Sequence, residues 1–555
     1  MEYHNGERIQ HAGVIPSMAA SRYTNKTAFS FMGQEVSFDE VETRANKIAQ
    51  TLVDLGVEPG DRVGLFIPNE PLFPAAYYGA IKAGAVATPL NLRMDPETLT
   101  YVLNDAGVSV LISSAFLSES TLGYDPMELA ESADLDAVLT PGQSDEERNI
   151  MNLSHKMGEA PAEFDIVDRE YGDIAAQPYT SGTTGQPKGV KLSHRNLLTT
   201  IESYGKSGLG IDADDTIVLV LPMFHIYALN ALMGSFMVRG GTVNLQPRPD
   251  IPTVLSALDS EDATTFAGVP ALYTQMWREY RENPDQYDLS SLEFVVCAAA
   301  PLADDVRKTI EREWNIPMIE GWGMTETSPA GTIEPVAGVK KAAGCIGPPL
   351  PGVELKLVDA DTRETVLGPD DLNPRPSEDI DFNDTDAVTG ELAIRGPQVF
   401  EGYHNKPEKT AEVKDDEGWF YTEDIARVDQ DGYFWMVDRA DDMIISGGNN
   451  IYPAEVEEAL YAHPDIAEAA VVAAPHEVKG QAPVAFVVPE EGADLTEEEV
   501  RKFSLEHVAS YAHPRRVFFQ DALPRSATNK VQRFELENQL ETMLEGSLKS
   551  SDEDL

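Results

Sequence analysis

Residues 180–189 read TSGTTGQPKG, with three glycines, three threonines, one serine and one lysine. Glycines allow positive φ angles, which turn successive backbone N–H groups toward one point, and the hydroxyl groups add further donors. Lys188 adds a positive charge. The order differs from GxxxxGK[ST], because the lysine precedes the last glycine. The stretch therefore predicts a loop that binds a polyanion such as a triphosphate, with a plain surface turn as the alternative.

The elements that must position this loop follow an α/β rhythm. Short apolar runs at 62–67, 85–90 and 108–114 alternate with helical patterns at 75–84 and 96–107. Such alternation predicts βαβ units and a mostly parallel sheet. The rhythm returns with strands at 217–221 and 294–298 and helices at 252–258 and 302–314.

After residue 340 the pattern changes. Short alternating segments at 353–359, 390–396 and 432–439 predict antiparallel strands of a small β-barrel-like subdomain. Residues 361–388 are rich in Asp and Pro and predict a long exposed loop. From about residue 440 a new run of helices and strands predicts a separate small α+β domain.

The expected fold class is α/β, in two domains and a tail. The large N-terminal domain, 1–440, holds parallel α/β subdomains and the β-barrel-like subdomain. Residues 441–545 form a small mobile α+β lid. Residues 546–555, ending in SSDEDL, form an acidic disordered tail.

Charge narrows the choice of partners. The chain has 94 Asp and Glu against 42 Lys and Arg, a net charge of -52. Such a surface repels nucleic acid and anionic lipid, so we expect neither as a partner. Acidic residues spread along the whole chain also favour a halophilic origin, because concentrated salt screens self-repulsion within about 3 Å at 1 M. An ordinary acidic protein is the plainer interpretation.

Two cysteines, Cys297 and Cys345, and no apolar leader at the start of the sequence favour a reducing, cytoplasmic location. One segment, 217–238, has no Lys, Arg, Asp or Glu and is long enough to span a bilayer. Pro222 and Gly234 interrupt it, so we expect a strand, a turn and a buried helix there, and no transmembrane segment.

Seven blocks of sequence occur in one order and together resemble the acyl- and aryl-CoA synthetases of the acyl-adenylate-forming superfamily. The blocks are YTSGTTGQPKGV (179–190), LPMFHIYAL (221–229), CAAAPL (297–302), EGWGMTETSP (320–329), YTEDIARVDQDGYFWMVDR (421–439), SGGNNIYPAEVE (446–457) and LPRSATNKVQRFEL (523–536). The resemblance extends from about Thr27 to Leu536.

The resemblance implies a two-step ligase that uses ATP, Mg²⁺ and coenzyme A. A carboxylic acid and ATP first give an acyl-adenylate and pyrophosphate, and CoA then displaces AMP to form a thioester. A carboxylate and the α-phosphate are both anionic, so the first step needs local positive charge.

The resemblance also assigns residues. For the β- and γ-phosphates it implies Thr180, Ser181, Gly182, Thr183, Thr184 and Lys188. For Mg²⁺ it implies Thr184 and Glu326, which offer hard oxygen ligands. For the adenine it implies stacking by Trp322, flanked by Gly321, Gly323, Met324 and Thr325, with a second wall of Ala298, Ala299, Ala300 and Pro301. For the ribose it implies Asp424 and Arg439. The catalytic set is Lys530, which would bridge the carboxylate and the α-phosphate, with Glu326 and Thr184.

A lysine needed in only one half-reaction implies that the small domain moves. In the resembling family the hinge lies two residues after the arginine, here Asp441. Rotation would withdraw Lys530 and bring in the loop that holds Gly447 and Gly448, opening a tunnel for CoA.

Four positions depart from the family pattern. Asn529 and Glu423 stand where glycine is usual, and the paired glycines of the adenine wall are Ala298 and Ala299. Asn tolerates positive φ well, so the turn before Lys530 can survive. No reacting group is lost.

The acid is a small-molecule carboxylate of uncertain class. The residues after Phe224 carry no carboxylate to hold an α-ammonium, which disfavours an amino acid. Gly323 replaces the tryptophan that fills the acyl pocket of acetyl-CoA synthetases, so we expect a medium- or long-chain fatty acid. The pocket candidates are His225 as a gate, then Tyr227, Met233, Val269, Gly323, Ala298, Ala330 and Val336.

Three alternatives stay open at this point. One is an aryl-CoA ligase, and a second is an adenylating enzyme that loads an acyl carrier protein. The third is a catalytically weak adenylate-binding protein, against which intact Lys530 and Glu326 argue. The oligomeric state is undecided, with a homodimer among the options.

Overall fold

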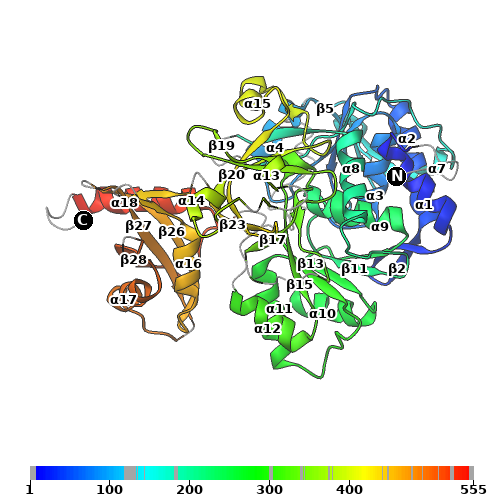
Figure 1. Cartoon of the computed structure of the whole chain (residues 1–555). Coiled ribbons are helices and arrows are strands. Elements are labelled where there is room, and N and C mark those ends of the chain that lie inside the picture. Colours follow the sequence, from blue (N-terminus) through cyan, green and yellow to red (C-terminus); the bar gives the residue numbers. More distant parts are fainter. Residues whose placement is uncertain are drawn as a thin grey trace.

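The chain forms a large N-terminal body and a separate C-terminal domain, which lies to the left in Figure 1. The computed structural model describes all residues except 1–7, 118–132, 134, 143, 181–185, 299–303, 338–341, 343, 373–375, 378, 440–441, 447–448, 477–478, 491, 511, 526–530 and 549–555. The expected α/β class with a separate small domain is confirmed.

A nine-stranded sheet carries the N-terminal βαβ units, and its inner strands are parallel. In sheet order its strands are β21 (Gly402–Tyr403), β10 (Lys188–Ser193), β8 (Ile174–Ala176), β4 (Val86–Pro89), β3 (Arg62–Phe66), β5 (Val108–Ser113), β6 (Ala137–Thr140) and β7 (Ile150–Asn152), with β9 (Tyr179–Thr180) paired to β10. The sequence predicted β3, β4 and β5 correctly.

An eight-stranded sheet lies beside it. In order its strands are β16 (Thr332–Ile333), β15 (Met318–Trp322), β14 (Phe294–Cys297), β13 (Thr265–Gly268), β11 (Thr216–Leu219), β12 (Thr242–Leu245), β1 (Thr27–Phe31) and β2 (Gln34–Ser37). The strands from β15 to β1 run parallel. One apolar cluster contains Leu65 of the first sheet and Val243 of the second, so the two sheets share a core.

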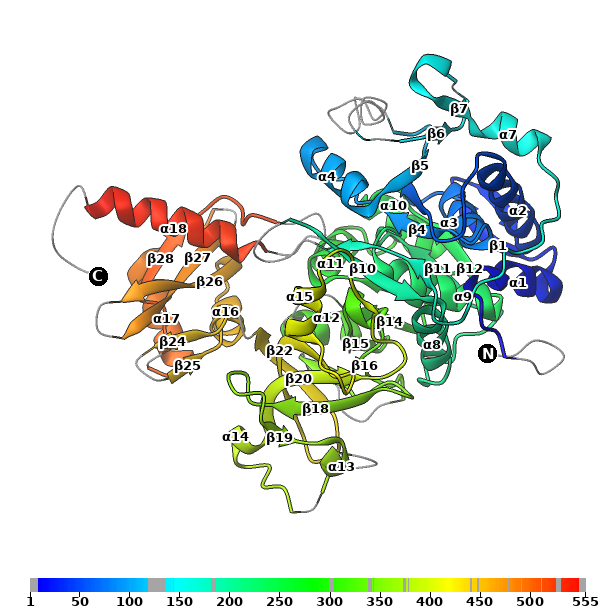
Figure 2. The ribbon, with the colours of Figure 1, turned by 90° about the horizontal axis from the view of Figure 1, so that it is seen from above.

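Helices cover and connect these sheets (Figures 1 and 2). Their bounds are η1 Ala12–Val14, α1 Ile15–Tyr23, α2 Phe38–Asp54, α3 Leu72–Lys82, α4 Pro96–Ala106, η2 Glu146–Arg148, α7 Leu153–Glu159, α8 His194–Gly205, α9 Gly234–Arg239, α10 Ile251–Ser260, α11 Pro270–Glu282, α12 Asp304–Trp314 and α15 Pro407–Val413. The sequence sets their starts. Ser37 and Glu40 form a capping box at α2, and Ser193 caps α8 directly after β10.

The segment that could have spanned a membrane instead forms β11, a π-helix η3 (Tyr227–Met233) and α9, as expected. Among the helices that the structure describes, none combines the length and apolar character needed to cross a bilayer.

A six-stranded antiparallel sheet follows, in the order β17 (Cys345–Gly347), β23 (Phe434–Arg439), β22 (Phe420–Val428), β20 (Thr389–Arg395), β18 (Glu354–Val358) and β19 (Thr365–Leu367). The expectation of a structureless loop at 361–388 is wrong in part. This segment contains β19, which pairs with β18, and the short helices α13 (Pro369–Leu372) and α14 (Thr385–Val388). The acidic composition of this segment predicted a loop, and elements of only three or four residues were not recognised within it.

The C-terminal domain has its own five-stranded sheet with helices on its faces (Figure 2). The strands are β24 (Ile444–Ser446), β25 (Asn449–Ile451), β26 (Ile466–His476), β27 (Gly480–Pro489) and β28 (Arg516–Phe519), and the helices are α16 (Pro453–Tyr461), α17 (Glu497–His507) and α18 (Arg533–Leu548). Because α18 runs to Leu548, residues 546–548 are helical and not part of a disordered tail. The predicted domain junction at 440–441 lies outside the described residues.

Candidate active site

Four neighbouring parallel strands of the eight-stranded sheet end at one edge, and a predicted site residue follows each of them. In sheet order the strands are β15, β14, β13 and β11. They are followed or ended by Trp322 (β15), Ala298 (β14), Val269 (β13) and His225 (β11). Ligands of open α/β sheets bind outside the carboxyl ends of the strands. Residues that are spread over about one hundred positions of sequence, from His225 to Trp322, therefore lie at one edge of the sheet, as a binding site requires.

Trp322 and Asp424 meet although they come from different sheets. The indole Nε1 of Trp322 donates to Asp424 Oδ2 at 2.7 Å. The indole face lies against Gly331, where any β-carbon would overlap the ring. Asp424 pairs across β22 and β23 with Arg439, the second predicted ribose residue. The predicted base-stacking and ribose-binding groups are therefore adjacent, and the indole fixes one carboxylate oxygen.

Glu423, which stands where the resembling family has glycine, adopts the conformation that favours glycine. Its φ is +62°, in the left-handed region. Its N–H donates to Glu391 Oε1 at 2.9 Å. Burial raises the pKa of Glu391, and the charges of Glu423 and Asp424 add to this effect. Within β22 the main chain beside Asp424 is thus strained at one residue, whose N–H is held by a buried carboxyl group.

The two ends of the predicted phosphate loop are hydrogen-bonded strands. Thr180 in β9 is the register partner of Lys188 in β10, so residues 181–187 connect an antiparallel pair. The ammonium Nζ of Lys188 lies 4.8 Å from the ring centroid of Tyr403. Behind the loop, Tyr179 donates its hydroxyl to Asp105 at 2.7 Å. The lysine is therefore presented from a fixed strand end.

Glu326 lies on the one-turn helix η4 (Thr325–Thr327) and is 5% exposed. The Tyr403 hydroxyl donates to its Oε1 at 2.8 Å. The Phe400 N–H donates to its main-chain oxygen, also at 2.8 Å. Sequence analysis did not identify Tyr403. It stands 77 positions from Glu326, and no motif spacing connects the two.

Four of the predicted acyl-pocket residues belong to one large apolar cluster, whereas Val269 packs against a second one. Met233 and Ala330 are buried in the main core cluster, and Tyr227 and Val336 pack against it. Burial raises the pKa of the Tyr227 hydroxyl well above its usual value, so this tyrosine is neutral. The ring of His225 lies 4.4 Å from that of Phe224.

Gly323 has a local reason for its lack of a side chain. A β-carbon there would collide with the Pro329 carbonyl oxygen. We expected the absence of an indole at this position to leave space for the acid. In the direction of a Cα–Cβ bond at Gly323, main-chain atoms of Pro329 occupy that space. The inference from Gly323 to a longer acid stays a prediction.

A charged cluster lies beneath the strand that carries Trp322. Arg307, 1% exposed, donates to Glu320 Oε1 and Glu334 Oε2, both at 2.9 Å, and to the carbonyls of Met318 and Ala342 at 2.7 and 3.0 Å. Burial raises the pKa of Glu320 to about 8 against the opposing effect of Arg307. Glu320 directly precedes Gly321 and Trp322 in sequence.

Several predicted site residues lie outside the described part of the chain. They are Ser181, Gly182, Thr183, Thr184, Ala299, Ala300, Pro301, Asp441, Gly447, Gly448 and Lys530. Of Arg439 only the main chain is described. Of the described residues, those on the elements named above are Thr180, Lys188, Gly321, Trp322, Thr325, Glu326 and Asp424, and those that lie one or two residues after a strand are Ala298, Gly323 and Met324.

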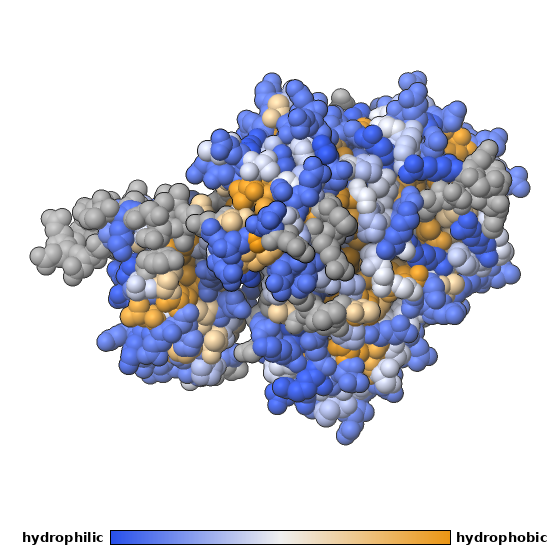
Figure 3. All heavy atoms as spheres, viewed as in Figure 1, coloured by the Kyte–Doolittle hydropathy of each residue, from blue (hydrophilic) through white to orange (hydrophobic). Residues whose placement is uncertain are grey.

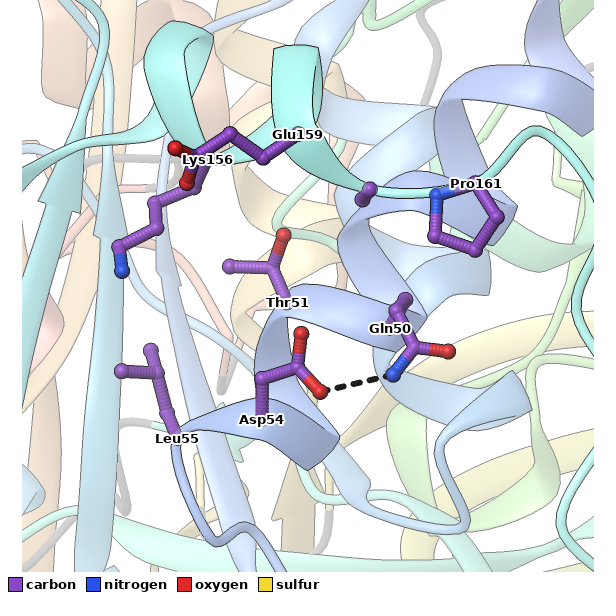
Figure 4. Close-up of a pocket in the computed structure, with 8 residues that line it drawn as sticks. Gln50, Thr51, Asp54, Leu55, Lys156, Glu159 and Pro161 are labelled. Atoms are coloured by element: carbon purple, nitrogen blue, oxygen red, sulfur yellow. Dashed lines mark hydrogen bonds between the residues drawn. The ribbon is translucent and has the colours of Figure 1, made fainter.

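A separate surface groove of about 350 Å³ runs between α2 and α7 (Figure 4). Gln50, Asp54, Lys156 and Glu159 line it, and Gln50 Nε2 donates to Asp54 Oδ1 at 2.8 Å. None of its lining residues belongs to the predicted site, so it plays no part in the reaction proposed below.

Comparison with known proteins agrees with this geometry. The "AMP-binding enzyme" family model matches residues 17–404, and the "AMP-binding enzyme C-terminal domain" model matches 455–530. The chain is 33% identical to a long-chain-fatty-acid–CoA ligase of Bacillus subtilis over 537 residues, covering 93% of this chain and 92% of the relative. It is 34% identical to a feruloyl-CoA synthase of an Amycolatopsis species over 534 residues, covering 94% and 98%.

A solved structure shares the whole architecture. The anthranilate CoA ligase AuaEII, in complex with anthranoyl-AMP, superposes with a TM-score of 0.85 at 26% identity, covering 96% of this chain and 98% of that one. The likeness therefore includes both the N-terminal body and the C-terminal domain.

Proposed function

Because the chain belongs to the family of AMP-binding enzymes and is an AMP-forming acid:CoA ligase that acts through an acyl-adenylate, we propose a specific assignment of its residues and substrate. ATP and CoA are its co-substrates, with a small-molecule carboxylic acid as the third. The observation that carries the assignment is the hydrogen bond of 2.7 Å between Trp322 and Asp424. It joins a stacking surface for a base to an acceptor for ribose hydroxyls.

The nucleotide lies across the carboxyl edge of the eight-stranded sheet. Adenine stacks on Trp322 and faces the wall that begins at Ala298, and Asp424 with Arg439 accepts and positions the ribose. Asp424 suits this role because a carboxylate is an acceptor with two oxygens, and the indole of Trp322 orients it from the base-stacking side. Lys188 and the loop at 180–184 then bind the β- and γ-phosphates. The fixed strand pair at the base of the loop supports this role.

Mg²⁺ is held by Glu326 with Thr184. The buried Glu326 carboxylate fits the ion because Mg²⁺ prefers hard oxygen ligands. When bound, the ion neutralises phosphate charge and orients the triphosphate. Lys530 bridges the substrate carboxylate and the α-phosphate, which lowers the repulsion between two anions in the first step.

The C-terminal domain then rotates about Asp441, which withdraws Lys530 and brings Gly447 and Gly448 toward the CoA path. The separate sheet and core of this domain support a rigid rotation.

The acid is a medium- or long-chain fatty acid. Two features support this choice: Met233, Ala330, Tyr227 and Val336 share one large apolar cluster, and a fatty-acyl relative is 33% identical. An aryl acid is the second candidate, because the feruloyl-CoA synthase is equally similar, at 34% identity over 94% of this chain. Transfer to an acyl carrier protein is the alternative for the acceptor.

The surroundings are also part of the proposal. The net charge of -52 supports a halophilic protein that does not bind nucleic acid. Figure 3 shows a largely hydrophilic face with several apolar areas. The buried free thiols of Cys297 and Cys345 support a reducing cytoplasm. A homodimer is the oligomeric state to test by light scattering.

The test is carboxylate-dependent exchange of pyrophosphate into ATP, measured in KCl from 0.1 to 3 M. Acids from acetate to palmitate are compared with benzoate, cinnamate and ferulate, and each reaction is repeated with CoA while AMP and thioester are followed. Exchange with chains of about eight carbons or more, and thioester on adding CoA, is expected. Exchange confined to aromatic acids would replace the fatty acid by the aryl candidate, and exchange without thioester would indicate a carrier protein.

Two variants test the residue roles. Lys188→Ala should weaken ATP binding, whereas Lys191→Ala, three positions along the same strand, serves as a control that removes the same charge. Lys530→Ala should abolish exchange while thioester formation from supplied acyl-adenylate persists. Equal loss in both half-reactions would contradict the rotation of the C-terminal domain.

A further inference from the structure

We propose that Tyr403 is a positioning residue that holds the metal-binding carboxylate and the phosphate-binding lysine apart and ready for MgATP. This inference rests on the roles proposed above for Glu326 and Lys188. Tyr403 is uncharged and is not itself a metal ligand. It lies in β21, outside the predicted motifs.

Tyr403 contacts both groups at once. Its hydroxyl donates to Glu326 Oε1 at 2.8 Å, and its ring centroid lies 4.8 Å from Lys188 Nζ. The first contact is a hydrogen bond to a charged acceptor, and the second is a cation–π contact. One side chain therefore sets where the carboxylate and the ammonium lie relative to each other.

The tyrosine is itself rigid, as a positioning role requires. It is 5% exposed and pairs with Val190 across β21 and β10, two residues along the strand from Lys188. Its N–H donates to Thr410 Oγ1 at 2.9 Å. Its ring also packs edge-on against Phe400 at 4.9 Å.

The neighbours of Tyr403 reinforce the same link. Phe400 donates its N–H to the Glu326 carbonyl at 2.8 Å, and His404 donates to the Gly189 carbonyl at 2.8 Å. The segment 400–404 therefore fastens the turn that holds Glu326 to the strand end that holds Lys188. These main-chain bonds remain when the tyrosine side chain is changed.

The chemical reason for such a residue is charge pairing. A buried carboxylate and a half-buried ammonium attract each other, and a direct pair would neutralise both. The phosphates need the ammonium, and the cation needs the carboxylate. Tyr403 gives each group a neutral partner, the ring face for Lys188 and the hydroxyl for Glu326.

The two parts of Tyr403 can be separated. Tyr403→Phe keeps the ring and removes the donor to Glu326, and Tyr403→Leu removes both. Tyr287→Phe is the matched control: Tyr287 is 4% exposed and donates to a glutamate, Glu279 Oε1, at 3.1 Å. It lies in the segment after α11, away from the proposed site.

Equilibrium binding of ATP is measured by calorimetry without acid or CoA, in Mg²⁺ and in EDTA. Tyr403→Phe should weaken MgATP binding by roughly ten- to a hundredfold, the effect of losing a hydrogen bond to a charged group. Its binding of ATP in EDTA should stay within about twofold of the unmodified protein, because only the carboxylate is affected. Tyr403→Leu should weaken both, and Tyr287→Phe neither.

Unchanged MgATP binding in Tyr403→Phe would overturn the inference, as would an equal loss with and without Mg²⁺. Glu326→Gln identifies which assumption has failed. If Glu326→Gln weakens MgATP binding but Tyr403→Phe does not, the tyrosine role is wrong and the metal assignment stands. If Glu326→Gln binds MgATP normally, the metal assignment itself is wrong and the role of Tyr403 falls with it.

Discussion

Arg307→Met is expected to destabilise the N-terminal body and to impair ATP binding together. The guanidinium is 1% exposed and donates to Glu320 and Glu334, each at 2.9 Å. Methionine fills a similar volume but removes the charge. Two buried carboxyl groups then face each other with no cation between them.

The magnitude follows from this uncompensated charge. Removing one partner of a buried ion pair costs about 3–5 kcal/mol of unfolding free energy. The cost should grow with pH. Burial already raises the pKa of Glu320 to about 8 and raises that of Glu334. Below that range the two carboxyls can take up protons and relieve the repulsion, whereas above it they are charged. The triple variant Arg307→Met, Glu320→Gln, Glu334→Gln should recover most of the loss.

The assay is urea denaturation at pH 6 and pH 9, with the KM for ATP measured at pH 7.5. Lys82→Met is the control, because Lys82 is 0% exposed and its ammonium bonds to Glu42 at 2.6 Å, far from the proposed site in sequence and on α3. Both variants should lose stability, but only Arg307→Met should raise the KM for ATP, because Glu320 adjoins Trp322. A loss below about 1 kcal/mol, or an equal KM effect in both variants, would refute the reasoning.

Three further outcomes are expected. Glu423→Gly should raise the unfolding free energy by about 1 kcal/mol, because φ there is +62° and a left-handed conformation disfavours side chains; the midpoint in urea checks this. Burial lowers the pKa of His11 to about 4 and of His194 to about 2. The unfolded chain therefore binds more protons below about pH 6.5, and stability should fall from pH 6.5 to pH 4 in urea titrations, with a smaller slope in His194→Asn. Trp322→Phe should weaken ATP binding about tenfold by removing the 2.7 Å bond to Asp424, with the KM for the acid unchanged.

Local patterns in the sequence predicted the strands and helices that carry the site. The apolar runs at 62–67 and 294–298 are buried parallel strands, and the helix at 302–314 is α12. These elements are long enough for periodicity to be visible. The segment 361–388 failed the same approach because β19 has only three residues, which is too short for any period.

Contacts between sheets were beyond the sequence. Tyr403 and Glu326 come from different elements, and their bond depends on how β21 docks on β10 beside η4. Nothing in the composition near Tyr403 marks it. Gly323 is a different case, because the sequence motif identified the position but not why it is glycine. The Pro329 carbonyl leaves no room for a side chain there. Tertiary packing, which no single-sequence pattern encodes, decides both.

The contacts around the proposed hinge divide into two groups. Arg533 donates to Asp442 at 2.9 Å and to both oxygens of Glu457 at 2.8 Å, so Asp442 is tied to the C-terminal domain. Asp438 lies on β23 of the N-terminal body, and its Oδ2 accepts the Ala454 N–H at 2.9 Å. The attachment of the chain therefore changes from one body to the other between residues 438 and 442, a range that contains Asp441.

This division also bears on how easily the domain can rotate. Two of the contacts that cross between the bodies are the Asp438–Ala454 bond and an exposed ion pair, Arg278 to Glu490 at 3.0 Å. Exposed ion pairs contribute about 0–1 kcal/mol, and salt screens them further. The bonds of Arg533 to Asp442 and Glu457 lie on the C-terminal side of Asp441, but the charge of Asp438 on the N-terminal body also raises the pKa of Arg533. Rotation about Asp441 would therefore break the exposed Arg278–Glu490 pair and separate Asp438 from Ala454, while the bonds of Arg533 to Asp442 and Glu457 would be kept.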